Sequence, residues 1–215
     1  MKDTLHNPQK LVTVGIRDLV TIGIFAAISL LMFIFIGGIA GMTVFGTIAN
    51  IPIVCLFTAV PYLLLAAKVK KVGVFFLMGT LNVLPGLMVG NLIGVGLCVL
   101  GWVIAEIIAS AGRYSSQKFL VTAYVTGCTI QSAGFTFPMY FSSVQYLSSR
   151  QKMLHLSDEM LSYYLSLFSW PLYGTMVALT TFTAFIGSVF ALRLLKKHFV
   201  KAGLIDVPDA ASVQN

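Results

Sequence analysis

Charged residues are scarce in this chain. Of its 215 residues only 10% are Asp, Glu, Lys or Arg, while 58% are hydrophobic. A soluble domain typically has about 25% charged residues, so this composition excludes an ordinary soluble fold. The mean hydropathy of +0.92 instead predicts an all-α integral membrane protein that crosses the bilayer several times.

Other functional signatures are also missing. Cys55, Cys98 and Cys128 lie inside apolar stretches and form no CxxC pair, which predicts buried, inert thiols and no metal site. A Gly-rich loop ending in GK[ST] does not occur, so ATP hydrolysis by that route is excluded. The net charge of +7 is not gathered in a basic patch with aromatic residues, and we expect no nucleic-acid partner.

Catalytic and carrier signatures are weak as well. Asp158 and Glu159 form the only acidic pair, and neighbouring side chains do not converge on a helix, so we expect no enzyme and no intrinsic cofactor. Internal repeats and a set of intramembrane charges, which a self-sufficient carrier would show, are absent. Such a carrier remains the main alternative function, and an integral-membrane enzyme is a weaker one.

Apolar runs are what the chain does have. They predict six transmembrane helices, at about 18–38, 44–69, 72–88, 92–111, 119–147 and 165–195. Residues 1–17 then form a cytoplasmic or interfacial leader, residues 18–198 the membrane domain and residues 199–215 a cytoplasmic tail. We expect the second span to be interrupted at Asn50-Ile51-Pro52 and Pro61, and the fifth to be broken at Gly134 and Pro138.

The basic residues predict the orientation. With six spans, twelve Lys and Arg residues lie on the side of the two termini, and only Arg150 and Lys152 lie on the other. The positive-inside rule therefore places both termini in the cytoplasm.

Uncharged polar and aromatic residues are concentrated in the predicted outer half of the bundle, close to helix-breaking prolines and glycines. Irregular backbone in a membrane is tolerated where it lines a cavity, and small-molecule sites are apolar with a few polar groups. We therefore predict a substrate pocket formed by Asn50, Asn82, Asn91, Gln131, Phe135, Tyr140, Trp170 and Tyr173. An aromatic belt at the membrane surface is the alternative, above all for Trp170.

The sequence also supports predictions for the polar segment at residues 148–164 and for Glu106. Residues 148–164 have an amphipathic pattern, which predicts a short helix that covers the pocket, with Ser157 as its N-cap. Apart from residues at the very ends of the spans, Glu106 is the only charged residue within a predicted span, and no His or Lys inside a span is available to pair with it. A proton relay is therefore poorly supported, and we expect a structural or interface role for Glu106.

The first span carries a pair of small residues. Gly23 and Ala27 are four residues apart and share one helical face, which would allow another helix to approach closely. This face either docks a membrane partner or packs within the chain, and the spacing alone does not decide between the two.

Three stretches, RDLVTIGIFAAISLLMFIF, FGTIANIPIV and LMGTLNVLPGLMVGN, carry a family resemblance. The chain resembles the S components of energy-coupling factor (ECF) transporters, in particular the Trep_Strep or MptD-like group, over residues 17–198. The resemblance implies a substrate-capture subunit in a prokaryotic plasma membrane that works with a membrane T component and two cytoplasmic ATPases. It also implies that Gly23 and Ala27 occupy the family's Ala-xxx-Ala docking motif, with Gly in place of the first Ala.

The substrate is less closely defined. A pocket of aromatic residues and amides without a buried Arg or Lys suits a flat, vitamin-like heterocycle. Haem remains open, with His155, Met153, Tyr140 and Tyr164 as conceivable ligands.

Overall fold

The structure, a computed structural model, describes residues 14–40, 46, 48–88, 90–149, 151 and 157–200. Throughout this part of the chain the regular elements are helices, and no strand occurs. The helices are α1 (Ile16–Ala40), α3 (Asn50–Val69), α4 (Val74–Val83), α5 (Pro85–Met88), α6 (Leu92–Ala111), α7 (Gln117–Phe141), α8 (Ser143–Ser148), α9 (Asp158–Leu167), α10 (Trp170–Leu194) and the π-helical η1 (Leu195–Val200).

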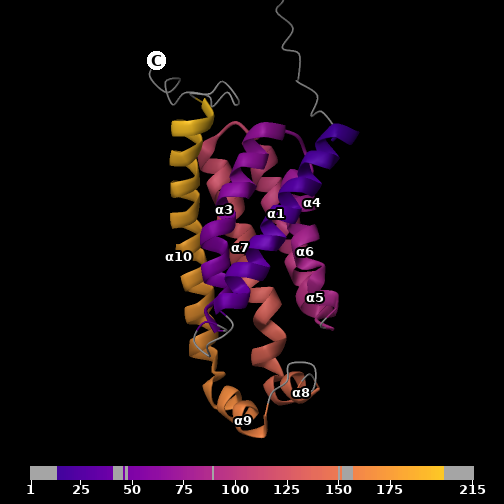
Figure 1. Ribbon diagram of the computed structural model, residues 1–215, viewed down its shortest axis with the longest axis vertical. Coiled ribbons are helices and arrows are strands. Elements are labelled where there is room, and N and C mark those ends of the chain that lie inside the picture. Colours follow the sequence, from indigo (N-terminus) through magenta and orange to yellow (C-terminus); the bar gives the residue numbers. More distant parts are fainter. Residues whose placement is uncertain are drawn as a thin grey trace, which may run out of the picture.

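The long helices pack side by side as a ring. In the described part of the chain, α1 contacts α3, α3 contacts α10, α10 contacts α7, α7 contacts α6, α6 contacts α4, and α4 returns to α1. Helix α1 begins and α10 ends at the same end of the bundle, whereas α8 and α9 lie at the opposite end (Figure 1). This arrangement confirms the prediction of an all-helical bundle.

Several helices have the length and composition of membrane spans. Within the described residues, four are long and apolar enough to cross a bilayer, namely Ile16–Ala40, Asn50–Val69, Leu92–Ala111 and Trp170–Lys197. Residues Val74–Met88 form a shorter apolar segment. Helix α7 has 25 residues and runs beside α6 and α10, but it carries more hydroxyl and amide side chains. A multi-pass membrane protein is therefore supported, and the count of six spans stays a prediction.

The interruption expected at Asn50-Ile51-Pro52 coincides with the start of α3 at Asn50, whereas those expected at Pro61, Gly134 and Pro138 do not occur. Helix α3 runs through Pro52 and Pro61, and Pro52 lies in the first turn, where a helix has no backbone acceptor for its N–H groups. Helix α7 is continuous through Gly134 and Pro138 and ends only at Phe141. A Cβ on Gly134 would lie 2.6 Å from Cβ of Leu97, so this glycine permits close packing against α6 instead of breaking the helix.

The third and sixth spans are divided differently as well. The segment 72–88 is two helices, because α4 ends before Leu84 and α5 begins at Pro85. The last long helix begins at Trp170, not at residue 165, since the Ser169 side chain accepts a hydrogen bond from the Leu172 N–H at 3.4 Å and so caps it. The short helix with Ser157 as its N-cap is confirmed as α9, with a distance of 3.2 Å to the Met160 N–H.

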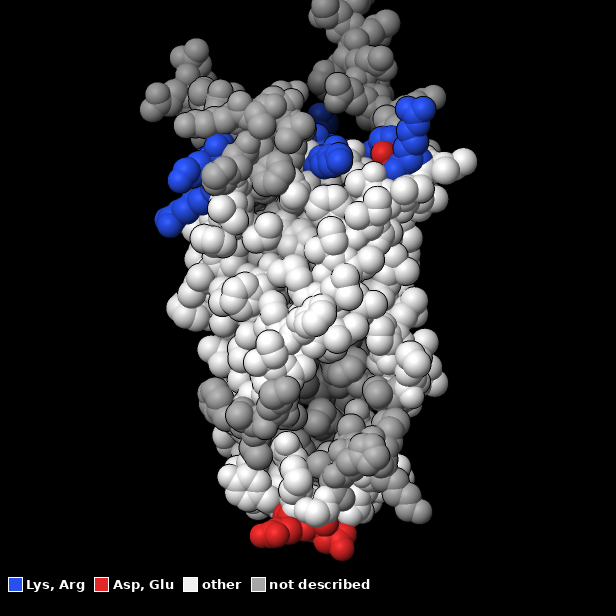
Figure 2. Space-filling view, viewed as in Figure 1, with Lys and Arg blue, Asp and Glu red and all other residues white. Residues whose placement is uncertain are grey.

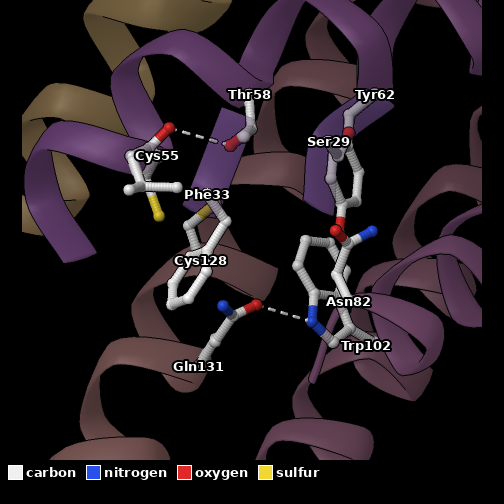
Figure 3. Close-up of a pocket in the computed structure, with 10 residues that line it drawn as sticks. Ser29, Phe33, Cys55, Thr58, Tyr62, Asn82, Trp102, Cys128 and Gln131 are labelled. Carbon is white, nitrogen blue, oxygen red and sulfur yellow. Dashed lines mark hydrogen bonds between the residues drawn. The ribbon is translucent and has the colours of Figure 1, made fainter. Parts of the chain in front are cut away.

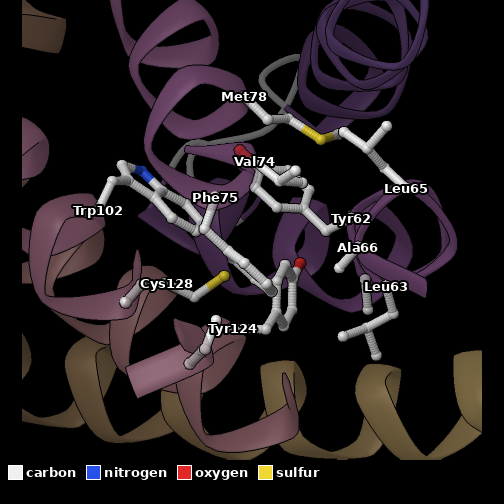
Figure 4. Packing of buried hydrophobic residues seen from close by; sticks show 14 of the residues in the cluster. Tyr62, Leu63, Leu65, Ala66, Val74, Phe75, Met78, Trp102, Tyr124 and Cys128 are labelled. Carbon is white, nitrogen blue, oxygen red and sulfur yellow. The ribbon is translucent and has the colours of Figure 1, made fainter. Parts of the chain in front are cut away.

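Aromatic rings from several helices form the core of the ring (Figure 4). Tyr62 of α3 stacks on Trp102 of α6 with 4.9 Å between ring centroids, and its ring also contacts Tyr124 of α7 at 5.3 Å and Phe75 of α4 at 6.4 Å. The Tyr124 hydroxyl donates a hydrogen bond of 2.6 Å to the Cys55 carbonyl. These contacts join four helices around one point, and Cys55, Cys98 and Cys128 are buried, as predicted.

The charges are divided between the two ends. In the view of Figure 2, Lys and Arg side chains lie at the end where α1 begins, and a group of acidic side chains lies at the other end. By their places at helix ends, the basic residues are Arg17, Lys68, Lys70, Lys71, Arg113, Lys118, Arg193, Lys196 and Lys197. The acidic end carries Asp158 and Glu159 of α9. Arg150 and Lys152 lie outside the described residues, so the full count of charges is not tested.

Candidate functional site

A cavity of about 30 Å³ lies inside the ring, between helices α1, α3, α4, α6 and α7 (Figure 3). Its lining residues are Ser29, Phe33, Val54, Cys55, Thr58, Tyr62, Asn82, Trp102, Cys128 and Gln131. Ser29 and Phe33 belong to the second half of α1, and Val54 to Thr58 belong to the first half of α3. The cavity therefore lies between the middle of the bundle and the end opposite the basic residues.

One wall of the cavity is a fixed pair of aromatic rings. The indole of Trp102 stacks on Tyr62, and its N–H donates a hydrogen bond of 2.9 Å to the Gln131 side-chain oxygen. Two glycines make room for this indole, because an added Cβ would lie 2.1 Å from it at Gly79 and 2.5 Å from it at Gly127. Trp102 is only 1% exposed, so it is held from several sides and forms a rigid wall.

The hydroxyl of Ser29 differs from the other polar groups around the cavity. Thr58 donates to the Val54 carbonyl at 3.0 Å and is hydrogen-bonded to Tyr124, and Asn82 donates to the Met78 carbonyl at 2.8 Å. Ser29 is 1% exposed, and its oxygen has no hydrogen-bond partner in the described structure. A buried hydroxyl without a partner is costly, by about 1–3 kcal/mol, and therefore marks a place where a ligand could supply the missing bond.

The residues predicted to form one pocket are divided among separate places. Asn82 and Gln131 line the cavity. Asn50 instead donates a hydrogen bond of 3.0 Å to the Gly37 carbonyl and so joins α3 to the end of α1. Asn91 caps α6 by accepting from the Gly94 N–H at 3.0 Å, and it donates to the carbonyl of Phe135 at 2.9 Å. Asn50 and Asn91 thus both form hydrogen bonds that connect helices of the bundle.

Of the predicted aromatic residues, Phe135 packs against the core beside Gly86, whereas Tyr140, Trp170 and Tyr173 form a cluster where α7 ends and α10 begins. Tyr140 lies 4.9 Å from Phe168 and 5.2 Å from Tyr173, measured between ring centroids, and Trp170 packs edge-on against Tyr173 at 5.7 Å. Trp170 is 55% exposed, which fits the aromatic-belt alternative. Tyr164 stacks on Phe168 in the same cluster, whereas His155 and Met153 lie outside the described residues.

Helix α1 has two distinct faces. Ile22, Ala26 and Ser29 are buried, whereas Gly23 and Ala27 are exposed. A Cβ added to Gly23 would meet no atom within 4 Å. Packing within the chain, one of the two explanations for this pair of small residues, therefore finds no support in the structure, and docking of a partner stays a prediction.

Comparison with known proteins places the chain in a family. The family model described as "Hypothetical bacterial integral membrane protein (Trep_Strep)" matches residues 16–201. The chain belongs to the Trep_Strep family. No curated protein and no solved structure matches it. The family supports a multi-pass protein of a bacterial membrane, and its description assigns no function.

Glu106 of this Trep_Strep chain accepts hydrogen bonds at the start of a neighbouring helix. Its carboxylate accepts from the N–H groups of Gly73 at 2.7 Å, Phe75 at 2.9 Å and Phe76 at 3.1 Å. The Tyr114 hydroxyl donates a further hydrogen bond to it. Glu106 therefore caps α4 from α6, where the helix dipole also favours a negative charge, and this contact has a structural role.

A wider groove of about 440 Å³ lies at the end of the Trep_Strep bundle opposite the basic residues, between the start of α6 and the junction of α7 and α8. It is lined by Gly90, Asn91, Leu92, Ile93, Pro138, Ser142, Gln145, Tyr146 and Ser149. The predicted pocket residue Asn91 is thus part of this groove and not of the inner cavity. Among the described residues, no group of three or more His, Cys, Asp or Glu side chains could hold a metal ion.

Sequence reasoning missed most of the residues that line the inner cavity. Ser29, Thr58, Tyr62 and Trp102 were not among the predicted site residues, although each is a polar or aromatic residue near the middle of an apolar run. The available signal was helical spacing. Ser29 lies seven residues after Ile22 and three after Ala26, which places all three on one face of the Trep_Strep α1.

Proposed function

We propose that this chain is the substrate-capture (S) subunit of an ECF-type importer in a prokaryotic plasma membrane. It crosses the bilayer six times, with both termini in the cytoplasm. It binds a vitamin-like heterocycle or another micronutrient from outside and passes it on with a membrane T component and two cytoplasmic ATPases.

The two faces of α1 are the observation that carries this proposal. One face lines the inner cavity with Ser29, and the other presents Gly23 and Ala27, which are exposed; among the described residues no atom lies within 4 Å of a Cβ added to Gly23. In lipid, helices associate through close packing at small residues, so the exposed face suits a helix of a second membrane protein. A single helix thus joins a candidate ligand site to a candidate docking surface, as a subunit that captures substrate for a partner requires.

The distribution of charge supports the orientation in this proposal. The basic end of the bundle corresponds to the cytoplasm by the positive-inside rule, and the acidic end with α9 corresponds to the outside. The inner cavity lies toward this outer end. Ligand access from outside and partner ATPases in the cytoplasm are both consistent with that placement.

Docking can be tested with bulky substitutions on the exposed face of α1. We expect Gly23→Trp and Ala27→Trp to reduce the amount of co-expressed, tagged T component that co-purifies by roughly 10-fold or more, because the indole holds the two helices apart. Gly96→Trp is the matched control, since Gly96 is an equally open glycine on α6. Normal co-purification of both α1 variants would show that the proposed docking face is wrong.

The class of ligand is tested on the purified subunit. Its absorption spectrum is recorded first, and any molecule released on denaturation is then identified by mass. A colourless protein that releases a small heterocycle supports vitamin capture. An intense Soret band would instead indicate haem and direct attention to the outer aromatic cluster, where Tyr140 and Tyr164 lie.

A further inference from the structure

The inner cavity has an uncharged lining, unlike the two ends of the molecule. Its lining consists of apolar, aromatic, hydroxyl, amide and thiol side chains, and none of the lining residues is Lys, Arg, His, Asp or Glu. A charged ligand placed there would lose its hydration and find no opposite charge. That transfer costs several kcal/mol for each unpaired charge, so the lining selects strongly against ions.

Ser29 supplies a second, independent observation. Ser29 is 1% exposed and lines the cavity, and its hydroxyl has no partner in the described structure (Figure 3). The other hydroxyl of α1, on Thr21, donates to the Arg17 carbonyl of its own helix at 3.0 Å. Ser29 could have bonded to its own helix in the same way but does not, so its donor and acceptor remain available to a ligand.

We infer that the inner cavity binds an uncharged ligand and that Ser29 is its hydrogen-bonding contact on α1. This inference rests on the proposed function and narrows its substrate class. The aromatic wall of Tyr62 and Trp102 adds a preference for a flat, apolar body beside the one polar group. A charged macrocycle such as haem would need a different site.

The size of the cavity indicates how the ligand is admitted. A volume of about 30 Å³ has room for roughly two water molecules, which is far less than a heterocyclic ring requires. Of the 25 residues in α1 only four are buried, and Phe33 at the cavity is 37% exposed. Because the Trp102 wall is fixed from several sides and α1 is mostly exposed, the inference requires α1 to move outward when a ligand enters.

The inference can be tested without knowing the ligand, by using thiol reagents that share one reactive group and differ in charge. The full-length Ser29→Cys variant in nanodiscs is treated with methanethiosulfonates that carry a neutral 3,3-dimethylbutyl, an anionic sulfonatoethyl or a cationic trimethylammonioethyl group, and the neutral and cationic groups have the same shape. Modification at each cysteine is read by peptide mass spectrometry, so Cys55, Cys98 and Cys128 stay in place. Relative to an exposed Ser162→Cys on α9, we expect both charged reagents to be at least about 10-fold slower at position 29 than the neutral reagent.

Ile28→Cys is the matched control, because Ile28 is adjacent on α1 but 42% exposed toward the outside of the bundle. A faster neutral reaction at position 29 than at position 28 supports an accessible cavity. Equal rates at the two positions, no reaction at position 29, or fast reaction there with either charged reagent would each overturn the inference. Because no partner protein is present, such a failure is distinct from a failure of the docking experiment.

Discussion

At the scale of single residues, Glu106 illustrates how hydrogen bonds within the fold can satisfy an intramembrane carboxylate. Three backbone N–H groups and one phenol donate to it, and the donors come from the α3–α4 turn, the start of α4 and the α6–α7 turn. Tyr114 reaches it from a left-handed backbone conformation with φ of 53°, directly after Arg113 with φ of 50°. Two strained residues in succession are tolerated because they bring the phenol to the carboxylate.

We expect Glu106→Gln to lower the free energy of unfolding by about 1–3 kcal/mol, because its amide nitrogen would face backbone donors and leave at least one unsatisfied. Tyr114→Phe should cost less, since it removes one hydrogen bond and leaves the three backbone donors satisfied. Thermal unfolding in detergent measures both. Glu159→Gln on the exposed surface of α9 is the control, and an equal melting temperature for Glu106→Gln and Glu159→Gln would refute the capping role.

At the scale of elements, α10 packs against α3 through small side chains. The buried residues of α10 are Thr180, Ala184, Gly187, Ser188 and Ala191. Without a hydrophobic driving force between helices in lipid, such residues stabilise the pair by letting the two backbones approach closely. The approach is tightest at Gly187, where an added Cβ would lie 2.3 Å from the Leu56 carbonyl oxygen.

Gly187→Ala should therefore destabilise the bundle by about 1–3 kcal/mol, since the obstructing atom belongs to a backbone that cannot rotate away. Gly174→Ala lies on the same helix, where an added Cβ meets no atom within 4 Å. That control should be neutral or stabilising by up to about 1 kcal/mol, through the lower flexibility of alanine in the unfolded chain. Detergent unfolding curves of the two variants give the comparison, and coincident curves would contradict close α3–α10 packing.

The same helix explains why sequence reasoning found the spans more easily than the site. Its buried side consists of small residues, two of which carry a hydroxyl, and its lipid-facing side is apolar, so α10 has no amphipathic pattern that identifies the inner face. Length and hydropathy were enough to locate the apolar runs. Helical spacing places Ser29 on the face of Ile22 and Ala26, but which face of each helix is buried depends on how the neighbouring helices pack, and no single run contains that information.

Helix starts marked by a capping residue were easier to predict from the sequence than interruptions within helices. Ser157 before Asp158-Glu159 correctly indicated the start of α9, because an N-cap acts within one turn. Proline and glycine were less informative, since Pro52 occupies a first turn and Gly134 allows a helix contact. Whether a glycine breaks its helix or permits close packing depends on the helix that packs against it.

At the scale of the whole molecule, the separation of charge predicts which end faces the cytoplasm. In intact cells, a membrane-impermeant maleimide should label Ser162→Cys at the acidic end but not Lys118→Cys at the basic end. Both positions are exposed, and the native cysteines are buried, so background labelling should be low. Permeabilised cells should give label at both positions. The reverse pattern in intact cells would place the termini outside.

The fold also separates the two tryptophans of the chain. Trp170 is 55% exposed at the end opposite the basic residues, whereas Trp102 is 1% exposed in the wall of the inner cavity. A water-soluble quencher therefore removes the emission of the first and leaves that of the second. Any molecule that enters the cavity must come to rest beside an indole, so the protein carries its own optical reporter of occupancy and needs no attached dye.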